Sequence, residues 1–390
     1  MDYLNITLTA VWCLFAFVIV WAMVGYPVFL TLLGKVIRRS LKKDYSYVPS
    51  VTVMVVAHNE EKVIWQKLEN LICVDYPRDK YKILVTSDYS TDKTNELVEK
   101  FIAEHKDFDI RLYKTVNHGG KTNAQNEAQK TIDTELLVMT DANCLFHKDA
   151  VKEIVANFAD EKIAYVCGAT VYVNSEDNNT ADSENTYWDL DSKCRDIEGR
   201  IQTITAGDGN LYACRTSQYE DIPLIECHDS SFPILFALKK FRAVFDPKSI
   251  AYEKAGESNQ DEYKRKVRMN RNILHNILPS IRILNVFKYK WFTIFYLGHR
   301  TCRYLLWFAH FIVLLLNAVL APSYVFWMVV LALQILFYAI ALFGQITKTE
   351  NKYIRMTNYY VMTVLSQWHG VFNIITGKAK PTWTKAESTR

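Results

Sequence analysis

Hydrophobic positions in this chain follow two patterns. Near both ends they form long uncharged tracts, and between residues 51 and 278 short apolar runs alternate with polar segments. The first tract, Tyr3–Gly34, contains no Asp, Glu, Lys or Arg. Its apolar part, Val11–Leu33, is longer than the roughly 20 residues that cross a bilayer. It is too long for a signal-peptide core and lacks a basic leader, so we predict a retained membrane span.

Two further tracts lie in the C-terminal part of the chain. Tyr304–Thr347 is uncharged and is interrupted only at Ala321–Ser323, so we predict two spans joined by a tight turn. Met356–Gly377 is apolar but contains a glutamine, a histidine and an asparagine. Because polar groups are costly in lipid, we expect this segment to pack on protein, to re-enter the membrane, or to lie partly in the interface.

The region between these tracts alternates strand-like and helix-like patterns. Continuous apolar runs suit buried parallel strands, and longer amphipathic segments suit helices. We predict strands at 51–57, 81–86, 110–114 and 135–140, and helices at 60–72, 91–105 and 121–131. Strands and helices that take turns in this way indicate an α/β sandwich with a mostly parallel sheet.

Five segments follow from these patterns. They are an N-terminal transmembrane helix with its basic flank (1–45), a soluble α/β domain (46–280), an amphipathic interface helix (281–303), a C-terminal transmembrane region (304–377) and a tail (378–390). Aromatic and basic residues interleave in Val286–Arg303, a composition that bilayer interfaces select. Nucleic-acid sites also combine basic and aromatic residues, but the adjacent uncharged tract favours the lipid bilayer as partner and no nucleic acid.

Composition and charge agree with this division. The chain of 390 residues is 50% hydrophobic, yet its mean hydropathy of -0.05 is too low for a protein that is membrane throughout. A basic run, Lys35–Lys43, follows the first span before any acid. The positive-inside rule therefore predicts a multi-pass cell-membrane protein with a cytoplasmic soluble domain. The tail is basic too, and we expect it in the cytoplasm although a simple count of four spans would place it outside.

Candidate site residues follow the predicted strands. Ala57-His58-Asn59-Glu60 follows the first strand, Ser87-Asp88 the second and Asp141-Ala142-Asn143 the fourth. In such sheets ligands bind beyond the carboxyl ends of the strands, so we expect these motifs to meet in one crevice. An isolated Asp after a strand is more often a helix cap or turn residue, but three coincident motifs favour a functional site.

The sequence around these residues resembles the family 2 inverting glycosyltransferases. Six strings stand in that family's order: Val51–Glu61, Asp75-Tyr76-Pro77, Ser87–Asp92, Gly119–Ala124, Asp141-Ala142-Asn143 and Gly207-Asp208-Gly209. Within the family the chain looks like the membrane-embedded polysaccharide synthases, the group that contains hyaluronan, chitin and cellulose synthases. The resemblance implies a GT-A-type nucleotide-sugar-binding fold with transmembrane helices at both ends.

This resemblance implies a binding site for a UDP-sugar donor. Asp88 would accept a hydrogen bond from the uracil imide, and Ala57, Asn59 and Glu60 would border the base and ribose. Lys121 follows two glycines at a helix start and would meet a base carbonyl or a phosphate as a mobile cation. Its structural alternative is a solvated residue at the start of a helix.

A divalent cation, Mg or Mn, is also implied, bound by Asp141 and Asn143 beside the nucleotide. The family's usual pattern has a second aspartate where Asn143 stands. An amide oxygen can bind a hard cation but brings no charge, so Asp141 would carry most of the binding. We expect an aspartate at position 143 to hold the cation at least as well.

Asp229 stands at the place of the family's general base. It would take a proton from the acceptor hydroxyl as that hydroxyl attacks the anomeric carbon. His228 replaces the usual acidic neighbour and would border the acceptor. Gly207, Asp208 and Gly209 resemble the loop that lines the acceptor site, although two glycines around an aspartate also suit a structural turn.

Two arginines and the tail complete the predicted site. Arg265 and Arg268 stand where processive synthases carry a Gln-x-x-Arg-Trp motif, and they would stabilise the diphosphate leaving group. Met269 replaces the Trp of that motif, so processivity does not follow from the resemblance. Trp383 and Arg390 lie in a tail similar to that of hyaluronan synthases and would form part of a gate at the nucleotide.

Together these features predict an inverting membrane glycosyltransferase that uses a UDP-sugar to extend a growing glycan, an extracellular or capsular polysaccharide. The missing Trp and the few spans keep a second hypothesis open, a single addition onto a polyprenyl-phosphate-linked acceptor. A third hypothesis is a catalytically inactive membrane partner protein, against which the three intact aspartates argue. Homo-oligomerisation also stays open.

Overall fold

The computed structural model of the chain describes residues 3–37, 39–173, 179–254, 259–347, 349 and 351–382, with side chains for all of these except 179–189 and 259. The chain divides into two compact units. The sheet unit comprises Gly34–Glu257, Arg282–Phe292 and Lys380–Arg390. The helical unit comprises Met1–Leu33, Ser258–Ile281 and Thr293–Ala379, so residues 258–281 cluster with the helices and not with the sheet.

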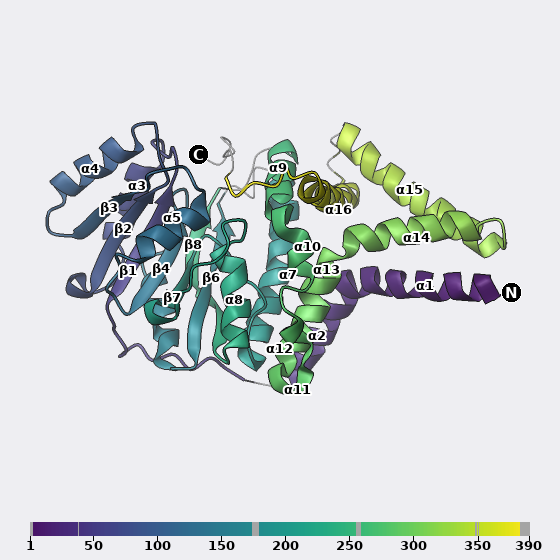
Figure 1. Cartoon of the computed structure of the whole chain (residues 1–390), viewed down its shortest axis with the longest axis horizontal. Helices are drawn as coiled ribbons and strands as arrows, with labels where there is room; N and C mark the ends of the chain where they lie inside the picture. The colour runs from purple at the N-terminus through teal and green to yellow at the C-terminus, as the bar shows by residue number, and fades with distance from the viewer. Residues whose placement is uncertain are drawn as a thin grey trace. The chain divides into compact units, whose positions relative to one another are not determined.

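One eight-stranded sheet, in the order β3-β2-β1-β4-β7-β6-β8-β5, is the centre of the sheet unit (Figure 1). The strands are β1 (Val51–Ala57), β2 (Tyr81–Ser87), β3 (Asp109–Lys114), β4 (Leu136–Asp141), β5 (Leu145–Phe146), β6 (Ile163–Tyr172), β7 (Tyr212–Arg215) and β8 (Arg242–Glu253). The first four agree with the predicted strands to within one residue at each end. Their parallel pairing places Ala57 opposite Ser87 and Val56 opposite Asp141, so the loops after these strands leave from one edge.

The sheet is mixed, and the prediction of a mostly parallel sheet is wrong. β7 pairs antiparallel with both β4 and β6, and β5 pairs antiparallel with β8. Only the β1–β4 half and the β6–β8 pair are parallel. The sequence patterns identified the strands of the parallel half, whose apolar runs are continuous because both faces are covered.

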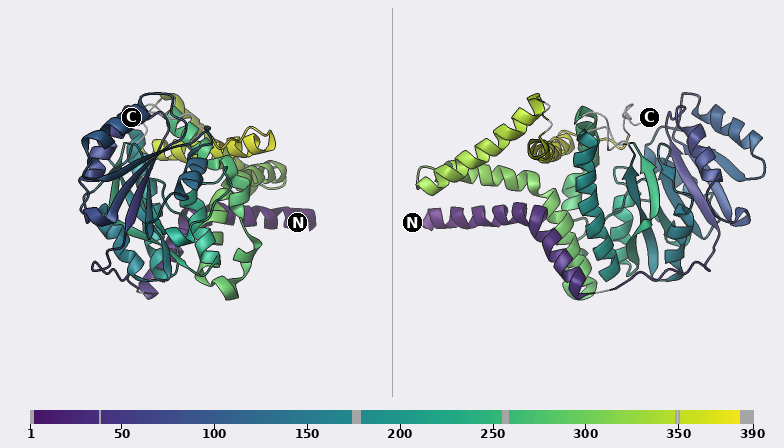
Figure 2. Two further views of the ribbon diagram at one scale, coloured as in Figure 1. Left: turned by 60° about the vertical axis from the view of Figure 1, so that its left-hand side comes forward. Right: turned by 180° about the vertical axis from the view of Figure 1, so that it is seen from behind.

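Helices cover both faces of the sheet (Figure 2). The alternate residues Val53 and Val55 of β1 pack with the helices α3 and α4 in one buried cluster, whereas Met54 and Val56 pack with α5 and α8 in another. The helices of this unit are α3 (Ile64–Ile72), η2 (Arg78–Lys80), α4 (Thr94–Glu104), α5 (Lys121–Gln129), α6 (Ala150–Val155), η3 (Ala156–Ala159), α7 (Asn179–Ile201), η4 (Thr216–Gln218), α8 (His228–Leu238) and α11 (Val286–Tyr289). This three-layer α/β arrangement confirms the predicted GT-A-like fold class.

Within the described residues, two continuous helices are long and apolar enough to cross a membrane, Tyr3–Val36 and Val325–Thr347. A third candidate is the pair Trp291–Tyr304 and Leu306–Leu320, which is bent by 60°. The elements of this unit and its flanks are α1 (Tyr3–Val20), η1 (Trp21–Gly25), α2 (Tyr26–Val36), α9 (Asn259–Met269), η5 (Asn270–Asn272), α10 (Ile273–Ile277), η6 (Ile281–Leu284), α12 (Trp291–Phe295), η7 (Tyr296–Thr301), α13 (Cys302–Tyr304), α14 (Leu306–Leu320), α15 (Val325–Thr347) and α16 (Lys352–Ile375). The predicted interface segment 281–303 is therefore several short elements and not one helix.

The apolar segment with polar residues near the C-terminus forms α16, which does not count among the candidate spans. Gln367 of this helix is 3% exposed. Its amide accepts a hydrogen bond from the backbone N–H of Trp307 (3.1 Å) and donates one to the carbonyl of Arg303 (3.0 Å). The polar atoms of the Gln367 side chain are thus hydrogen-bonded within the protein, which agrees with the predicted alternative that this segment packs on protein.

Candidate active site

The loops after β1 and β2 hold each other in place. The backbone N–H of Asp88 donates to the carbonyl of Ala57 (2.8 Å). Asn59 adopts a left-handed backbone with φ 55°, and its Oδ1 accepts from the backbone N–H of Thr91 (2.7 Å). Glu60 is buried at the entrance to α3. Ala57, Asn59 and Glu60 therefore lie at the predicted strand ends, and their contact with a nucleotide stays a prediction.

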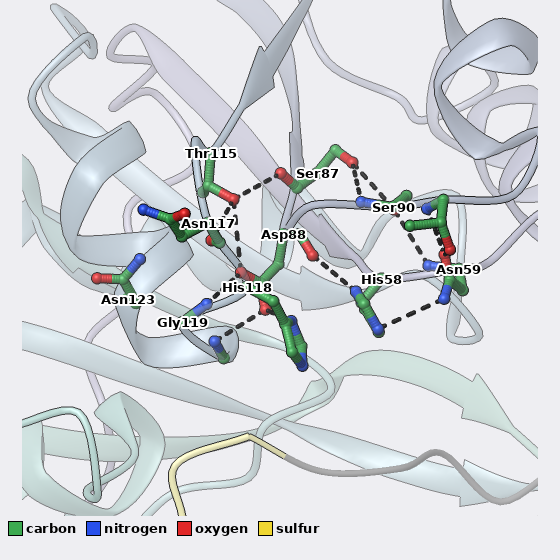
Figure 3. Close-up of polar contacts among 12 residues, drawn as sticks. His58, Asn59, Ser87, Asp88, Ser90, Thr115, Asn117, His118, Gly119 and Asn123 are labelled. Atoms are coloured by element: carbon green, nitrogen blue, oxygen red, sulfur yellow. Dashed lines mark hydrogen bonds and ion pairs between the residues drawn. The ribbon is translucent and has the colours of Figure 1, made fainter.

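Asp88 is buried, and its carboxylate organises the turn before α5 (Figure 3). Its Oδ1 accepts from the backbone N–H of Gly119 (3.0 Å), and its Oδ2 accepts from that of Gly120 (2.9 Å). His118 Nδ1 lies 2.8 Å from the same Oδ2. Gly120 has φ 89°, which a residue without Cβ adopts at little cost. These contacts are within the protein, so the proposed hydrogen bond from Asp88 to a uracil stays a prediction.

Two histidines lie against Asp88. The rings of His58 and His118 stack with centroids 4.0 Å apart and planes 20° apart, and His58 Nδ1 is 2.6 Å from the Asp88 carbonyl oxygen. Across the described parts of the chain, these three residues are the one group of three whose potential ligand atoms lie within 4.8 Å of one another. Ring-nitrogen lone pairs lie in the ring planes, so two stacked, nearly parallel rings do not direct them at one ion. The geometry suits hydrogen bonding and stacking better than metal binding.

Lys121 brings a positive charge to the end of β4. Its ammonium contacts Oδ1 of Asp141 and lies 3.4 Å from the carbonyl oxygen of Gly209. Burial alone would lower the pKa of Lys121, but the carboxylates of Asp141 and Asp229 outweigh burial and raise it. Lys121 is therefore a charged ammonium. It contacts Asp141 at the end of β4, lies near the predicted acceptor loop and interacts electrostatically with the predicted base, Asp229.

The predicted acceptor loop contacts the start of α8. The backbone N–H of Gly207 donates to the carbonyl of Asp229 (2.8 Å), and so does the hydroxyl of Tyr165 (3.3 Å). A Cβ on Gly207 would lie 1.9 Å from the Tyr165 hydroxyl oxygen, so no larger residue fits. A Cβ on Gly209 would lie 3.2 Å from Lys121 Nζ and 3.9 Å from Asp229 Cγ. Both glycines thus let the loop approach the predicted base closely.

The carboxyl of Asp229 has a raised pKa. Burial is the main cause, the Lys121 ammonium opposes it, and the nearby carboxylates of Asp208 and Asp141 add to it. A higher pKa makes the ionised carboxylate a stronger proton acceptor, which is what a general base requires. Asp141, Lys121, Asp208 and Asp229, all predicted from the sequence, therefore form one electrostatically connected cluster.

His228 differs from its predicted place. Its side chain is 1% exposed, with Nδ1 2.9 Å from Gln125 Oε1 and Nε2 2.7 Å from the Tyr219 hydroxyl, so it is not positioned to touch an acceptor. Burial, followed by the Lys121 charge, lowers the pKa of His228 to about 3. The imidazole therefore stays neutral and anchors the first turn of α8, which carries Asp229.

Sequence reasoning missed two residues that contact the predicted motifs. Glu253, at the end of β8, accepts hydrogen bonds from Asn143 Nδ2 (2.9 Å) and Asn210 Nδ2 (2.6 Å). Lys67 of α3 is fully buried, and its ammonium donates to Thr140 Oγ1 (3.0 Å). Neither residue belongs to a recognisable motif. The sequence offered one local signal for Lys67, its place among the apolar residues of an amphipathic helix, and it offered none for Glu253.

The predicted arginines lie on α9 in the helical unit. Arg265 donates to Glu262 from Nε (2.7 Å) and Nη2 (3.0 Å). Burial alone would raise the pKa of Glu262, but Arg265 and Lys266 lower it. A role of Arg265 or Arg268 at a diphosphate stays a prediction.

The predicted gate residues Trp383 and Arg390 lie outside the described residues. The last described residues nevertheless reach the turn before α5. A Cβ built on Gly120 would lie 2.8 Å from the carbonyl oxygen of Pro381 and 3.5 Å from the backbone nitrogen of Thr382. Pro381 and Thr382 therefore lie next to the glycine that donates to Asp88.

Comparison with known proteins agrees with this geometry. Residues 52–215 match the model of the family described as Glycosyl transferase family 2. Over 166 residues, 40% of this chain, the sequence is 30% identical to the "Probable glycosyltransferase YdaM" of Bacillus subtilis (strain 168), of which the match covers 40%. Over 141 residues, 36% of this chain, it is 28% identical to the "Beta-monoglucosyldiacylglycerol synthase" of Nostoc sp. (strain PCC 7120 / SAG 25.82 / UTEX 2576), of which the match covers 30%. The chain thus matches less than half the length of either relative.

Among solved structures, the mannosyltransferase PcManGT from Pyrobaculum calidifontis in complex with GDP-Man and Mn2+ has a TM-score of 0.70 to this chain at 21% identity. The similarity covers 93% of this chain and 99% of that one, and it shows a shared fold. The family match spans β1 to β7, the part of the sheet that carries Asp88, Lys121, Asp141 and the acceptor loop. Residues 52–215 are therefore similar to the glycosyltransferases of family 2, and the chain shares the fold of a solved glycosyltransferase.

Proposed function

We propose that the protein is an inverting glycosyltransferase that takes a sugar from a UDP-sugar and adds it to a growing polysaccharide at a membrane. The observation that carries the proposal is the Asp141–Lys121–Asp229 cluster. One half-buried ammonium touches the carboxylate at the end of β4, and the Asp229 carboxyl lies against the same loop of small residues. This arrangement provides a positive charge for a diphosphate and a base for a hydroxyl side by side.

In the proposed reaction the Asp229 carboxylate takes the proton of an acceptor hydroxyl. The hydroxyl oxygen forms a bond to the anomeric carbon, and the bond from that carbon to the diphosphate oxygen breaks on the opposite face. The nucleoside diphosphate leaves with both bonding electrons, so one displacement inverts the configuration. In this proposal Lys121 stabilises the negative charge that develops on the leaving group.

The residues at the end of β4 fit a divalent cation. Asp141 has a carboxylate whose Oδ2 accepts no hydrogen bond from the described residues, and Asn143 offers an amide oxygen, both of them hard oxygen ligands. A bound Mg or Mn would neutralise charge on the donor's diphosphate. The Mn2+ in the PcManGT complex, a protein of the same fold, supports this choice of metal.

A second candidate is the addition of one sugar to a lipid-linked acceptor. Two observations favour it. The Nostoc relative is named a glucosyldiacylglycerol synthase, and Met269 stands where processive synthases have a Trp. The two candidates share the donor site and differ in the acceptor, so the product distinguishes them.

The test is to incubate the purified full-length chain with a panel of UDP-sugars and with GDP-mannose, with and without Mn2+, and to measure nucleoside diphosphate release. Polymer made from the donor alone supports the first candidate, and one sugar on an added lipid extract supports the second. Asp229→Asn should reduce turnover to below about one per cent, since a general base is typically worth 10²–10⁴-fold. Its affinity for UDP should stay within a few-fold, because the base acts on the acceptor.

Asp107→Asn is the matched control, because Asp107 forms an exposed ion pair with Arg78 and the change removes the same charge. It should keep the wild-type rate. Turnover of Asp229→Asn close to that of Asp107→Asn would remove Asp229 as the base. No diphosphate release from any donor would instead favour an inactive membrane partner protein.

A further inference from the structure

Glu253 lies beside Asn143, the residue that stands in place of the family's usual second aspartate. In this chain the residue two positions after Asp141 is Asn143, which brings no charge. We infer that Glu253 orients the Asn143 amide so that its oxygen is free for the cation. We also infer that the Glu253 carboxylate, hydrogen-bonded to the Asn143 NH2 group, supplies the negative charge that an aspartate at position 143 would bring. The inference rests on the proposed function, because it assumes that Asp141 and Asn143 hold a divalent cation beside a nucleoside diphosphate.

The sheet brings these residues together from distant parts of the sequence. β5 pairs antiparallel with β8, and Leu145 lies opposite Tyr252. Asn143 precedes Leu145 by two residues and Glu253 follows Tyr252 directly, so both side chains lie at the same end of this strand pair. The contact between Asn143 Nδ2 and Glu253 Oε1 measures 2.9 Å.

The hydrogen bond fixes which way the amide points. A carboxylate oxygen can only accept, so the group of Asn143 that faces Glu253 must be its NH2 and not its carbonyl. Among the residues that the structure describes, Asn143 Oδ1 accepts no hydrogen bond, and neither does Asp141 Oδ2. Two oxygen atoms in the motif Asp141-Ala142-Asn143 thus remain available as ligands.

The same contact also polarises the Asn143 amide. A hydrogen bond to an ionised acceptor is stronger than a neutral one and polarises its donor, which makes the amide oxygen on the far side a better ligand. Residues that orient a metal ligand in this way typically change metal affinity by about 10–100-fold when they are removed.

Glu253 also connects the cation site to the acceptor loop. Its Oε2 accepts from Asn210 Nδ2 at 2.6 Å, and Asn210 directly follows Gly207-Asp208-Gly209. Asn210 Nδ2 lies 3.1 Å from Thr170 Oγ1 as well. One carboxylate therefore fixes both the asparagine of the cation motif and the loop beside Asp229, which makes Glu253 a positioning residue.

Exchanging the amide and the carboxylate tests this arrangement. In Glu253→Gln the new side chain has one acceptor oxygen for two NH2 groups, so the Asn143 amide can flip and turn its NH2 toward the cation. We expect Mn2+ affinity, measured on the UDP-bound full-length chain, to fall by about 10–100-fold. Asn143→Asp alone places two carboxylates in contact, so it should not bind Mn2+ more tightly than the wild type, although the sequence alone also allowed an increase.

The double variant Asn143→Asp/Glu253→Gln should restore Mn2+ affinity to within a few-fold of the wild type. The glutamine at 253 then donates its NH2 to the aspartate at 143 and still accepts from Asn210 with its oxygen. The readouts are the electron paramagnetic resonance signal of free Mn2+ during titration and the UDP dissociation constant with and without Mn2+ by calorimetry. Neither depends on turnover.

Glu161→Gln is the matched control, because it makes the same change at an exposed residue of the turn before β6. Its Mn2+ affinity should equal that of the wild type. Unchanged Mn2+ affinity in Glu253→Gln, or a double variant no tighter than both single variants, overturns the inference and leaves the proposed function intact. If Glu253→Gln does not fold, the double variant alone decides. Wild-type protein that binds neither UDP nor GDP more tightly with Mn2+ overturns the cation site and with it this inference.

Discussion

Asp229 lies among charges that act on its pKa in opposite directions. Burial raises the pKa, the Lys121 ammonium lowers it, and Asp208 and Asp141 raise it further. The pKa of a general base sets the acid limb of the pH–rate profile, because protonation removes the acceptor lone pair. If Asp229 is the base, as we propose, its neighbours set the pH below which activity is lost.

Asp208→Asn removes one of the two carboxylates that raise the pKa of Asp229, so that pKa should fall. The acid limb of kcat/KM should then move to lower pH, whatever the change in the maximal rate. The measurement is a pH profile of kcat/KM on the best donor from the panel. Asp107→Asn, which neutralises an exposed carboxylate, should leave the midpoint in place. A midpoint that stays fixed or moves to higher pH in Asp208→Asn would contradict the electrostatic account.

Lys67 links a helix to the loop that carries the cation motif. It projects from α3, donates to Thr140 Oγ1 at the end of β4 and to the carbonyl of Cys144 just before β5, and lies 4.1 Å from the centre of the Phe146 ring. Burial lowers its pKa to about 8, although Cys144 and Asp141 oppose this. Both ends of the Asp141–Asn143 segment are thus held by one ammonium that is costly to bury.

This cost predicts a pH-dependent stability. The pKa of Lys67 is about 8 in the folded state and about 10.4 in an unfolded chain, so between these values the unfolded state binds more protons. The contribution of Lys67 to the free energy of unfolding is therefore fully present above pH ~10, and it is lost as the pH falls toward 8. Lys67→Met should flatten the change in melting temperature between pH 8 and 10 relative to the wild type. Lys82→Met, at a more exposed lysine paired with Asp133, should not flatten it; equal slopes in all three proteins would argue against a buried charge.

The elements that the sequence predicted well are those whose pattern is local. β1 is buried at all seven positions, and its run of apolar residues ends at the turn that carries Asn59, so its bounds follow from the sequence alone. β7 has four residues, and its antiparallel place between β4 and β6 depends on pairs such as Leu136 with Arg215, which no local pattern encodes. The mixed sheet was missed for that reason.

The candidate site divides in the same way. Asp88, Asp141 and Asp229 were found because each follows a strand or begins a helix within a short motif. The partners that determine their chemistry were not found, because Asn143 meets Glu253 from 110 positions away and Asp88 receives its donors from the turn at Gly119. The burial of His228 was not predicted, because a histidine beside a candidate base looks the same in sequence whether it faces a cleft or the core.

At the level of the whole chain, the number of membrane crossings determines which side the tail lies on. One candidate span, Tyr3–Val36, precedes the α/β domain that contains the sheet. After the domain come α15 and the bent pair of Trp291–Tyr304 with Leu306–Leu320, whereas α16 is not a candidate span. If the bent pair crosses, the chain crosses twice after the domain and returns to the domain's side. If it does not, the tail ends on the opposite side.

The contact of the tail supports two crossings after the domain. Pro381 lies against Gly120, and both belong to the sheet unit, so we expect the chain at Pro381 to lie on the same side of the membrane as the domain. The basic run after the first span predicts that this compartment is the cytoplasm. The expected topology therefore has three spans, with the domain and the C-terminus both inside.

A single cysteine placed after Arg390, in a background without the eight native cysteines, tests this topology. It should resist an impermeant thiol reagent in intact cells and react after permeabilisation. A cysteine inserted at Ser323, in the turn between α14 and α15, is the matched control and should react from outside without permeabilisation. Labelling of the C-terminal cysteine from outside would mean that the bent pair does not cross, and it would exclude any role for Trp383 and Arg390 at a cytoplasmic nucleotide site.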